Sequence, residues 1–283
     1  MSQVALKREE FHPMPGDRFK DLPMEFYHGG DGVSKSGLSL VGQSPLHYWN
    51  AYLNPDREAR TETPAQMLGS AIHCMVLEPE LFDSQYVVPP KINKRSSAGK
   101  EEWAQWETNN QGKILLDVDQ IETVKRAADS VLKHRLAKAY LSNGTAEESF
   151  FWEDEETGTL CKCRPDFNRD DILVDLKTTA DASKKAFMRT ITNFNYHVSD
   201  VFSSAGYEAV TGRTPKAYKF IVVETKAPYG VAIYDLDDAA RERGRELMRR
   251  ELDLFAECIK TNTWPGYSEA SETLSLPAYA FFD

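Results

Sequence analysis

The sequence has no apolar run near the roughly 20 residues that a membrane-spanning helix requires. Its first residues, MSQVALKREEFHPMPGD, also lack the apolar stretch of a secretory signal peptide. The four cysteines are too few for a disulfide framework and form no Cys-x-x-Cys pair, so reduced thiols are expected and zinc or iron–sulfur binding is disfavoured. These absences predict a cytoplasmic protein with no membrane partner.

An excess of positive charge is also absent, because 34 Lys and Arg stand against 44 Asp and Glu and give a net charge of −10. A protein that coats nucleic acid through bulk charge depends on clustered basic residues, so the net charge argues against that class. An enzyme that gathers carboxylates around divalent ions carries local acid by necessity, and a basic groove can coexist with an acidic exterior. The charge balance therefore leaves open a metal-dependent enzyme that acts on DNA.

The 283 residues, of which 41% are hydrophobic, can bury a full core. Residues 1–24 are polar and interrupted by Pro and Gly, so they are expected to form a flexible tail ahead of a single domain over 25–283. The expected helices are two short ones within 33–53, one over 63–82, one after a basic loop at 89–100, one over 118–141, one or two within 184–212, and a long one capped by Asp237. The expected strands are 146–154, 159–167, 172–179, 216–225 and 229–237. This order predicts an α/β fold of the mixed α+β kind, with a central mixed β-sheet flanked by helices.

Two aspartates and a lysine stand out in the strands expected near the middle of the chain. Asp166 follows Pro165, while Asp175 and Lys177 are two residues apart on the next strand and so project from one face. A Lys and an Asp on one strand face are often a solvated pair, but the strand ILVDLKTT is otherwise apolar, and burying charges there is costly unless they bind something. Mg2+ prefers oxygen ligands and would accept both carboxylates together with the main-chain carbonyl of Leu176. The ammonium group would orient the attacking water and offset charge in a phosphoryl-transfer transition state.

Several motifs follow one another along the chain: VSKSGL, SPLHYW, LGSAIHCMVLEPE, AEES, RPD, VDLKTT and NYHV. In these motifs the sequence resembles the RecE-type exonucleases, also called exodeoxyribonuclease VIII-like, which are relatives of the lambda-type phage exonucleases in the PD-(D/E)XK superfamily. The resemblance runs from about Tyr27 to about Trp264. It implies a PD-(D/E)XK, restriction-endonuclease-like core and a location in the cytoplasm of a bacterial host cell.

The resemblance also implies roles for single residues. Asp166 and Asp175 would be metal ligands, Lys177 would be the catalytic lysine, and Glu147 in the AEES motif would complete the acidic cluster. His73 would lie at the metal site, where a neutral imidazole can bind the ion. The alternative for His73 is a core histidine on an apolar helix.

One motif of this superfamily branch is missing from the sequence. A helix with a QxxxY motif usually follows the lysine strand, and its Gln and Tyr support the active site and the DNA strand. When NYHVSDVFSSAGYEAVTG is aligned on Tyr196 and His197, Ser199 and Ser203 occupy those two positions, and neither side chain reaches as far. Either the nuclease is weakened or specialised, or other residues supply this support.

Candidate DNA contacts come from several segments. The loop PPKINKRSSAGK is basic and precedes Trp103 and Trp106, whose rings could stack on an unpaired base, although a solvated loop and core tryptophans are the alternative. Side chains of the VSKSGL motif could donate hydrogen bonds to a phosphate, although helix capping explains the serines equally well. The predicted DNA contacts are Ser34, Lys35, Ser36, Lys94, Arg95, Lys100 and His197.

The resemblance implies an exonuclease that uses Mg2+, with Mn2+ as a substitute, and degrades one strand of linear duplex DNA from its 5′ end. It implies phage-type homologous recombination, a ring-like homo-oligomer, double-stranded DNA ends as substrate and a single-strand annealing recombinase as partner. A catalytically weakened protein that binds DNA ends or a partner is the alternative. An iron–sulfur nuclease of related fold is a third interpretation, which the scattered positions of Cys74 and Cys258 disfavour.

Overall fold

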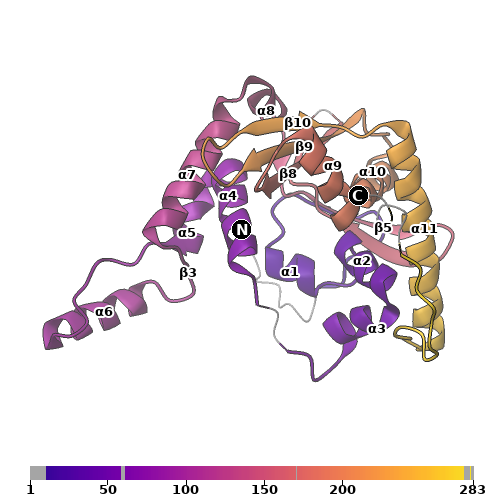
Figure 1. Cartoon of the computed structure of the whole chain (residues 1–283), viewed down its shortest axis with the longest axis horizontal. Coiled ribbons are helices and arrows are strands. Elements are labelled where there is room, and N and C mark those ends of the chain that lie inside the picture. The colour runs from indigo at the N-terminus through magenta and orange to yellow at the C-terminus, as the bar shows by residue number, and fades with distance from the viewer. Residues whose placement is uncertain (1–10, 59–60, 170, 277–280, 282–283) are drawn as a thin grey trace, which may run out of the picture.

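The computed structural model describes residues 11–58, 61–169, 171–276 and 281. Its central sheet has the strand order β10-β9-β8-β7-β4, in which β8 and β9 run parallel and the other neighbours run antiparallel. The strands are β4 (Thr145–Ala146), β7 (Phe167–Arg169), β8 (Ile172–Thr179), β9 (Ala217–Glu224) and β10 (Val231–Tyr234). Helices lie around this sheet (Figure 1), so the expected mixed sheet flanked by helices is confirmed.

A long antiparallel ribbon bends from the central sheet into a second sheet. In the central sheet Ala146 pairs with Phe167, and in the second sheet Phe150 pairs with Cys163, so the register continues unchanged through the bend. The second sheet has the order β1-β5-β6 and contains β1 (Arg18–Phe19), β5 (Ser149–Asp154) and β6 (Thr159–Cys163). The expected pairing of the two strand segments is right, but the unbroken strand over 159–167 is wrong. The strand stops before Pro165, which has no amide hydrogen for a ladder bond.

The N-terminal segment is part of the fold from residue 11 onward. The rings of Phe11 and Phe19 pack on Phe151 of β5, with centroids 6.1 and 5.9 Å away, and β1 pairs with β5. The flexible tail expected over 1–24 is therefore wrong for residues 11–24, because these aromatic side chains cover an apolar face of β5. Residues 1–10 lie outside the described residues.

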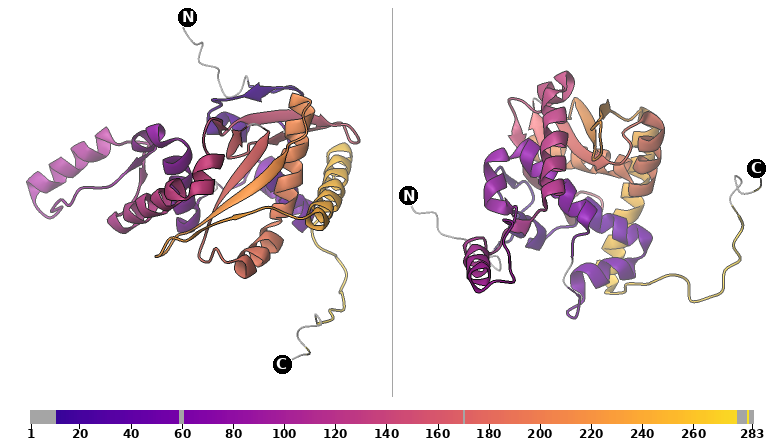
Figure 2. Two further views of the ribbon diagram at one scale, coloured as in Figure 1. Left: turned by 90° about the horizontal axis from the view of Figure 1, so that it is seen from above. Right: turned by 60° about the vertical axis from the view of Figure 1, so that its left-hand side comes forward.

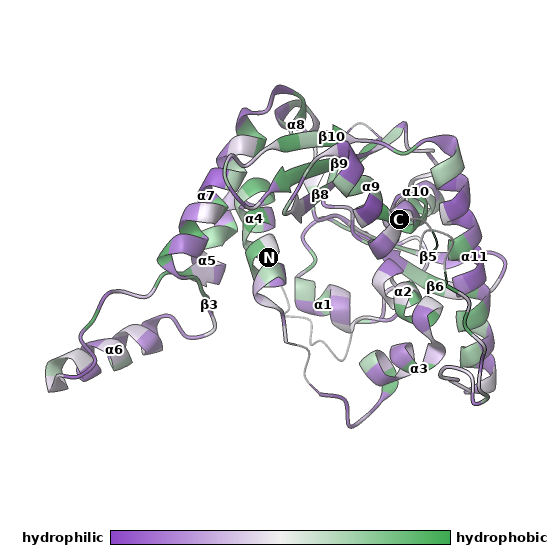
Figure 3. Ribbon diagram, in the orientation of Figure 1, coloured by the Kyte–Doolittle hydropathy of each residue, from purple (hydrophilic) through white to green (hydrophobic). Residues whose placement is uncertain are grey.

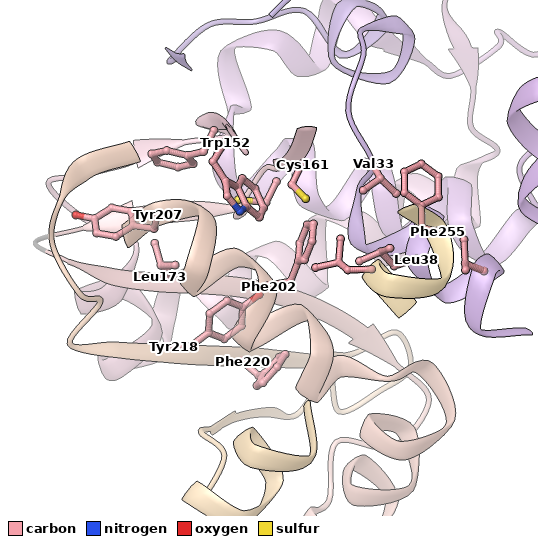
Figure 4. Close-up of a cluster of buried hydrophobic side chains, with 14 of the residues drawn as sticks. Val33, Leu38, Trp152, Cys161, Leu173, Phe202, Tyr207, Tyr218, Phe220 and Phe255 are labelled. Carbon is pink, nitrogen blue, oxygen red and sulfur yellow. The ribbon is translucent and has the colours of Figure 1, made fainter. Parts of the chain in front are cut away.

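Two apolar cores occupy the opposite faces of the central sheet. Because successive side chains of a strand point to opposite faces, Leu173 of β8 enters one core and Val174 the other. α9 and α10 contribute to the first core, part of which is shown in Figure 4, and α4 and α7 contribute to the second. α11 packs against α10 and α2. These helices are α2 (Lys35–Gln43), α4 (Pro64–Leu77), α7 (Val118–Lys133), α9 (Lys184–Phe194), α10 (Tyr196–Thr211) and α11 (Asp238–Thr261). In Figure 3 the buried strands β8 and β9 are largely hydrophobic, whereas α11 carries both hydrophilic and hydrophobic residues.

Two expected helices are divided where the backbone or a side chain favours a stop. The helix expected over 63–82 ends ahead of Pro79, and the one over 118–141 breaks at His134. The one or two helices expected within 184–212 are two, separated at Asn195, whose φ is 51°. The Nδ1 atom of His134 accepts a hydrogen bond from the amide of Ala137 at 3.3 Å and caps the next helix. The remaining elements are α1 (Met24–Gly29), α3 (Pro45–Tyr48), a π-helical turn (Trp49–Leu53), a 3-10 turn (Pro79–Leu81), α5 (Phe82–Gln85), β2 (Tyr86–Val87), α6 (Ser97–Asn109), β3 (Ile114–Leu115) and α8 (Arg135–Tyr140).

α6 projects away from the rest of the molecule as an arm (Figures 1 and 2). The short parallel pair β2 and β3 joins its two ends to the body, with Tyr86 opposite Ile114. Within α6 itself only Gly99 is buried. Among the described residues, no helix is both long and apolar enough to cross a membrane.

The close approach of α10 and α11 depends on Gly244. A Cβ atom at this position would lie 2.4 Å from the main-chain oxygen of His197, which belongs to a packed helix. We expect Gly244→Ala to lower the free energy of unfolding by about 1–3 kcal/mol, because the backbone clash outweighs the better helix propensity of alanine. Urea unfolding followed by circular dichroism measures this, with Arg245→Ala on the exposed side of α11 as the control. An unchanged or raised unfolding free energy in Gly244→Ala would show that the two helices are not held at this distance.

Candidate metal centre

Asp166 lies at the bend of the ribbon, beside the middle of β8. β7 pairs with β8 in a register that places Phe167 opposite Val174, so the preceding residue, Asp166, falls next to Asp175. The Oδ2 atom of Asp166 accepts a hydrogen bond from the amide of Leu176 at 2.6 Å. The amide and carbonyl of one strand residue point to the same side, so the Leu176 carbonyl also faces the side where Asp166 lies.

Asp175 and Lys177 project together from β8, as their spacing predicts. The Lys177 ammonium contacts the Oδ1 atom of Asp175, and its nitrogen lies 4.9 Å from the centre of the Tyr196 ring. The other carboxylate oxygen of Asp175 accepts a hydrogen bond from the Tyr218 hydroxyl at 2.9 Å. Burial disfavours the charged lysine, but Asp175 and Asp166 outweigh burial and raise the pKa of Lys177 above its ordinary value. The lysine is therefore an ammonium ion at neutral pH.

Glu147 comes to the same place because it opposes Asp166 across the bend. Its amide donates to the main-chain oxygen of Asp166 at 3.1 Å, and its φ of 49° turns the chain from β4 towards β5. The next residue, Glu148, points elsewhere and pairs with Arg18. The bend thus separates two adjacent glutamates, of which Glu147 faces the aspartates.

α4 brings His73 to the cluster from the other side. The helix begins with a capping box between Thr63 and Gln66. It lies close to β8 at Gly69, where an added Cβ would be 3.2 Å from Oγ1 of Thr178. His73 is one turn further along, and its Nδ1 atom is 3.7 Å from Oδ2 of Asp166. His73 thus faces the Asp166 carboxylate, and its side chain is 25% exposed.

Three side chains can offer one ligand atom each to a single ion. The ligand atoms of His73, Glu147 and Asp166 all lie within 4.8 Å of one another. Burial and the nearby charge of Asp166 raise the pKa of Glu147 to about 8. Burial raises the pKa of Asp166 to about 6, with His73 opposing and Asp175 reinforcing the shift. Crowded carboxylates with raised pKa values and an imidazole are a donor set that fits a divalent cation, whose charge would offset their repulsion.

Lys35 of the VSKSGL motif lies near this cluster, because its ammonium and that of Lys177 both lie over the Tyr196 ring. The Ser34 hydroxyl accepts from the amide of Gly37 at 3.3 Å and pairs with the Ser36 hydroxyl at 2.9 Å, so the capping interpretation holds for Ser34. The Lys35 ammonium donates to the main-chain oxygen of Phe194 at 2.6 Å. The Lys35 nitrogen lies 5.7 Å from the centre of the Tyr196 ring, and burial together with the nearby Lys177 lowers the pKa of Lys35 to about 8.

The structure does not bring the other predicted DNA contacts to the cluster. His197 is only 8% exposed, which argues against a DNA contact there. Lys100 lies on α6, and Lys94 and Arg95 lie in the segment just before it, where the Lys94 ammonium faces the Trp103 ring of α6. In Figure 1 α6 stands away from the central sheet.

Two tyrosines near the cluster were not predicted from the sequence. Tyr218 alternates with Phe220 in the strand AYKFIVVE, where an aromatic residue is ordinary core material. Tyr196 was noted only as an alignment point, yet its ring lies beside both Lys177 and Lys35. Both tyrosines reach the cluster through contacts between elements that are distant in the sequence, and no spacing in the sequence indicates these contacts.

The mixed sheet carries a bent ribbon, and an Asp and an Asp-x-Lys pair lie beside its central strands. These features place the protein in the PD-(D/E)XK class. Residues 34–277 match the family described as "PDDEXK-like domain of unknown function (DUF3799)", and the chain belongs to that family. A solved structure from Eubacterium rectale, described as "Putative exonuclease", has the same fold with a TM-score of 0.57 at 12% sequence identity. The superposition covers 87% of this chain and 90% of that chain. No curated protein matches the sequence.

Proposed function

We propose that this protein is a metal-dependent deoxyribonuclease that hydrolyses phosphodiester bonds at the ends of linear double-stranded DNA. The observation that carries the proposal is the set of His73, Glu147 and Asp166, with ligand atoms within 4.8 Å of one another, beside the Asp175 and Lys177 pair. The word exonuclease in the description of the Eubacterium rectale structure agrees with action at ends. Degradation from the 5′ end in phage-type recombination rests on the resemblance to RecE-type enzymes.

Each residue of the centre has a distinct part in the proposed reaction. His73, Glu147, Asp166, Asp175 and the Leu176 carbonyl would hold the ion, Mg2+ in the cell and Mn2+ as a substitute. A bound divalent ion polarises a phosphoryl oxygen and makes water a stronger nucleophile near neutral pH. The Lys177 ammonium would orient the attacking water and stabilise the negative charge that develops on the phosphate.

The direct test is hydrolysis by the purified full-length chain. Linear duplex labelled at the 5′ or the 3′ end is incubated with Mg2+, Mn2+ or EDTA, with covalently closed circular duplex as the matched substrate. Release of nucleotides from linear DNA alone, dependent on the ion and starting from the 5′ label, is expected. Binding of linear DNA without any release would contradict the proposal and favour the DNA-end-binding alternative, in which Ser199 and Ser203 reflect lost catalysis.

The arm is proposed as a second DNA contact. The Lys94 ammonium lies 2.9 Å from the centre of the Trp103 ring, and the rings of Trp103 and Trp106 are 4.9 Å apart, so a cation and two indoles share one surface. This combination suits phosphates and unpaired bases.

We expect the triple substitution of Lys94, Arg95 and Lys100 by alanine to weaken DNA binding at every sequence and to flatten its salt dependence. If each residue neutralises one phosphate, the slope of log K against log salt should become less negative by about 2.7. Fluorescence anisotropy at several salt concentrations measures this. Alanines at Lys125, Lys133 and Lys138, on α7 and α8, are the charge-matched control. Equal slopes for the two triple variants would remove the arm from the DNA-binding surface.

The partners implied by the resemblance also remain proposals. They are a ring-like homo-oligomer that surrounds the DNA and a single-strand annealing recombinase that receives the 3′ strand. Neither proposal is needed for the chemistry at the metal centre.

A further inference from the structure

Tyr218 is a buried tyrosine whose hydroxyl contacts Asp175, the carboxylate beside the His73, Glu147 and Asp166 cluster. It lies on β9 opposite Leu173 and is 4% exposed. Its surroundings are apolar, and Figure 4 shows it in the same core as Leu173, Phe202 and Phe220. A buried hydroxyl without a partner is destabilising, and this one donates a hydrogen bond to Oδ2 of Asp175 at 2.9 Å.

The parallel pairing of β8 and β9 accounts for this contact. Asp175 lies opposite Phe220, and Tyr218 is two residues earlier on the same face of β9, so its long ring reaches the carboxylate diagonally. An ionised carboxylate only accepts hydrogen bonds. The Lys177 ammonium contacts one oxygen of Asp175 and the Tyr218 hydroxyl contacts the other, so the plane of the carboxylate is fixed from two sides.

We propose that Tyr218 is the positioning residue of Asp175 and supplies support that Ser199 and Ser203 cannot give at the QxxxY positions. The proposal rests on the proposed metal-dependent function. Tyr218 acts through the aspartate, because its hydroxyl is buried behind the carboxylate. Loss of a group that orients a metal ligand typically lowers metal affinity or activity by about 10- to 100-fold.

The test compares two Tyr→Phe substitutions that each remove one hydrogen-bonding hydroxyl. Tyr218→Phe removes the donor to Asp175, whereas Tyr234→Phe removes a donor to the main-chain oxygen of Ala182, at 2.7 Å and away from the centre. The Kd for Mn2+ is measured on the full chain from the electron paramagnetic resonance of free Mn2+, and kcat and KM are measured on linear duplex. Tyr218→Phe should weaken Mn2+ binding and lower kcat, each by about 10- to 100-fold, with KM for DNA unchanged. Tyr234→Phe should keep the parent values.

Parent-like Mn2+ affinity and kcat in a folded Tyr218→Phe protein would overturn the proposal. Loss of the folded state in this variant would assign the hydroxyl to stability and overturn it equally. A double-mutant cycle adds a sharper criterion, because Tyr218→Phe should cause no further loss of Mn2+ affinity in an Asp175→Asn background. Additive losses would show that the tyrosine does not act through the aspartate. A parent protein that binds Mn2+ but cleaves nothing would contradict the nuclease function, while the Mn2+ measurements would still decide the role of Tyr218.

Discussion

Lys177→Ala should abolish most of the DNA hydrolysis while leaving the ion bound. The ammonium is held beside Asp175 and over the Tyr196 ring, next to the cluster that would hold the ion. Removing one preorganised group that stabilises transition-state charge typically costs about 100- to 1,000-fold in kcat. We expect a loss of that size in initial rates on linear duplex with saturating Mg2+.

The same variant should keep its affinity for Mn2+, because His73, Glu147 and Asp166 do not include the lysine. Lys133→Ala is the control, since Lys133 lies on the exposed side of α7 in a pair with Asp129. Melting curves of all proteins establish that the fold is retained. A folded Lys177→Ala protein with the parent rate would show that this lysine has no part in the chemistry.

The local pattern of the sequence predicted the strand that carries this lysine. ILVDLKTT is apolar except for its charged pair, and β8 covers Ile172–Thr179 as expected. The alternation of a strand then fixed the shared face of Asp175 and Lys177, because that relation depends only on the backbone. Asp237 likewise caps α11 through the amide of Ala240, as its position before an amphipathic run predicts.

The relations that depend on tertiary contacts could not be predicted in this way. The ribbon keeps one register through residues 146–167, so nothing local indicates that it bends into a second sheet and places Glu147 beside Asp166. The residues around Phe11 and Phe19 are polar, so the local sequence does not indicate that these two aromatic side chains pack on β5. Burial of His197 under α11 depends on Gly244, which is nearly fifty positions away in the sequence.

Asp166→Asn should separate two effects of the acidic cluster: the destabilisation of the fold by like charges, and the binding of a divalent ion. An asparagine oxygen can still accept the hydrogen bond from the Leu176 amide, so the bend of the ribbon should persist. The variant removes one carboxylate from the ligand set and one charge from beside Glu147 and Asp175. We expect it to lose the rise in melting temperature that Mn2+ gives the parent protein, together with nearly all DNA hydrolysis.

Without the ion, this variant should be more stable than the parent protein at pH 8. The pKa of Asp166 is raised to about 6 in the folded state from 3.8. A carboxyl group with a raised folded-state pKa destabilises the fold once pH exceeds the unfolded value, and the cost grows until pH passes the folded value. The gain in Asp166→Asn should therefore approach about 3 kcal/mol at pH 8 and should fall below about 1 kcal/mol near pH 4.

Urea unfolding in EDTA at both pH values measures this gain, and Asp129→Asn on α7 serves as the exposed control. Lower stability of Asp166→Asn at pH 8 would mean that the carboxylate holds the bend together by itself, without repulsion from its neighbours. The cluster would then be a structural hydrogen-bonding site, and repulsion between carboxylates would no longer be a reason to expect an ion there. A stability gain combined with the loss of the Mn2+ effect is the pattern of a site in which like charges are kept together to bind a cation.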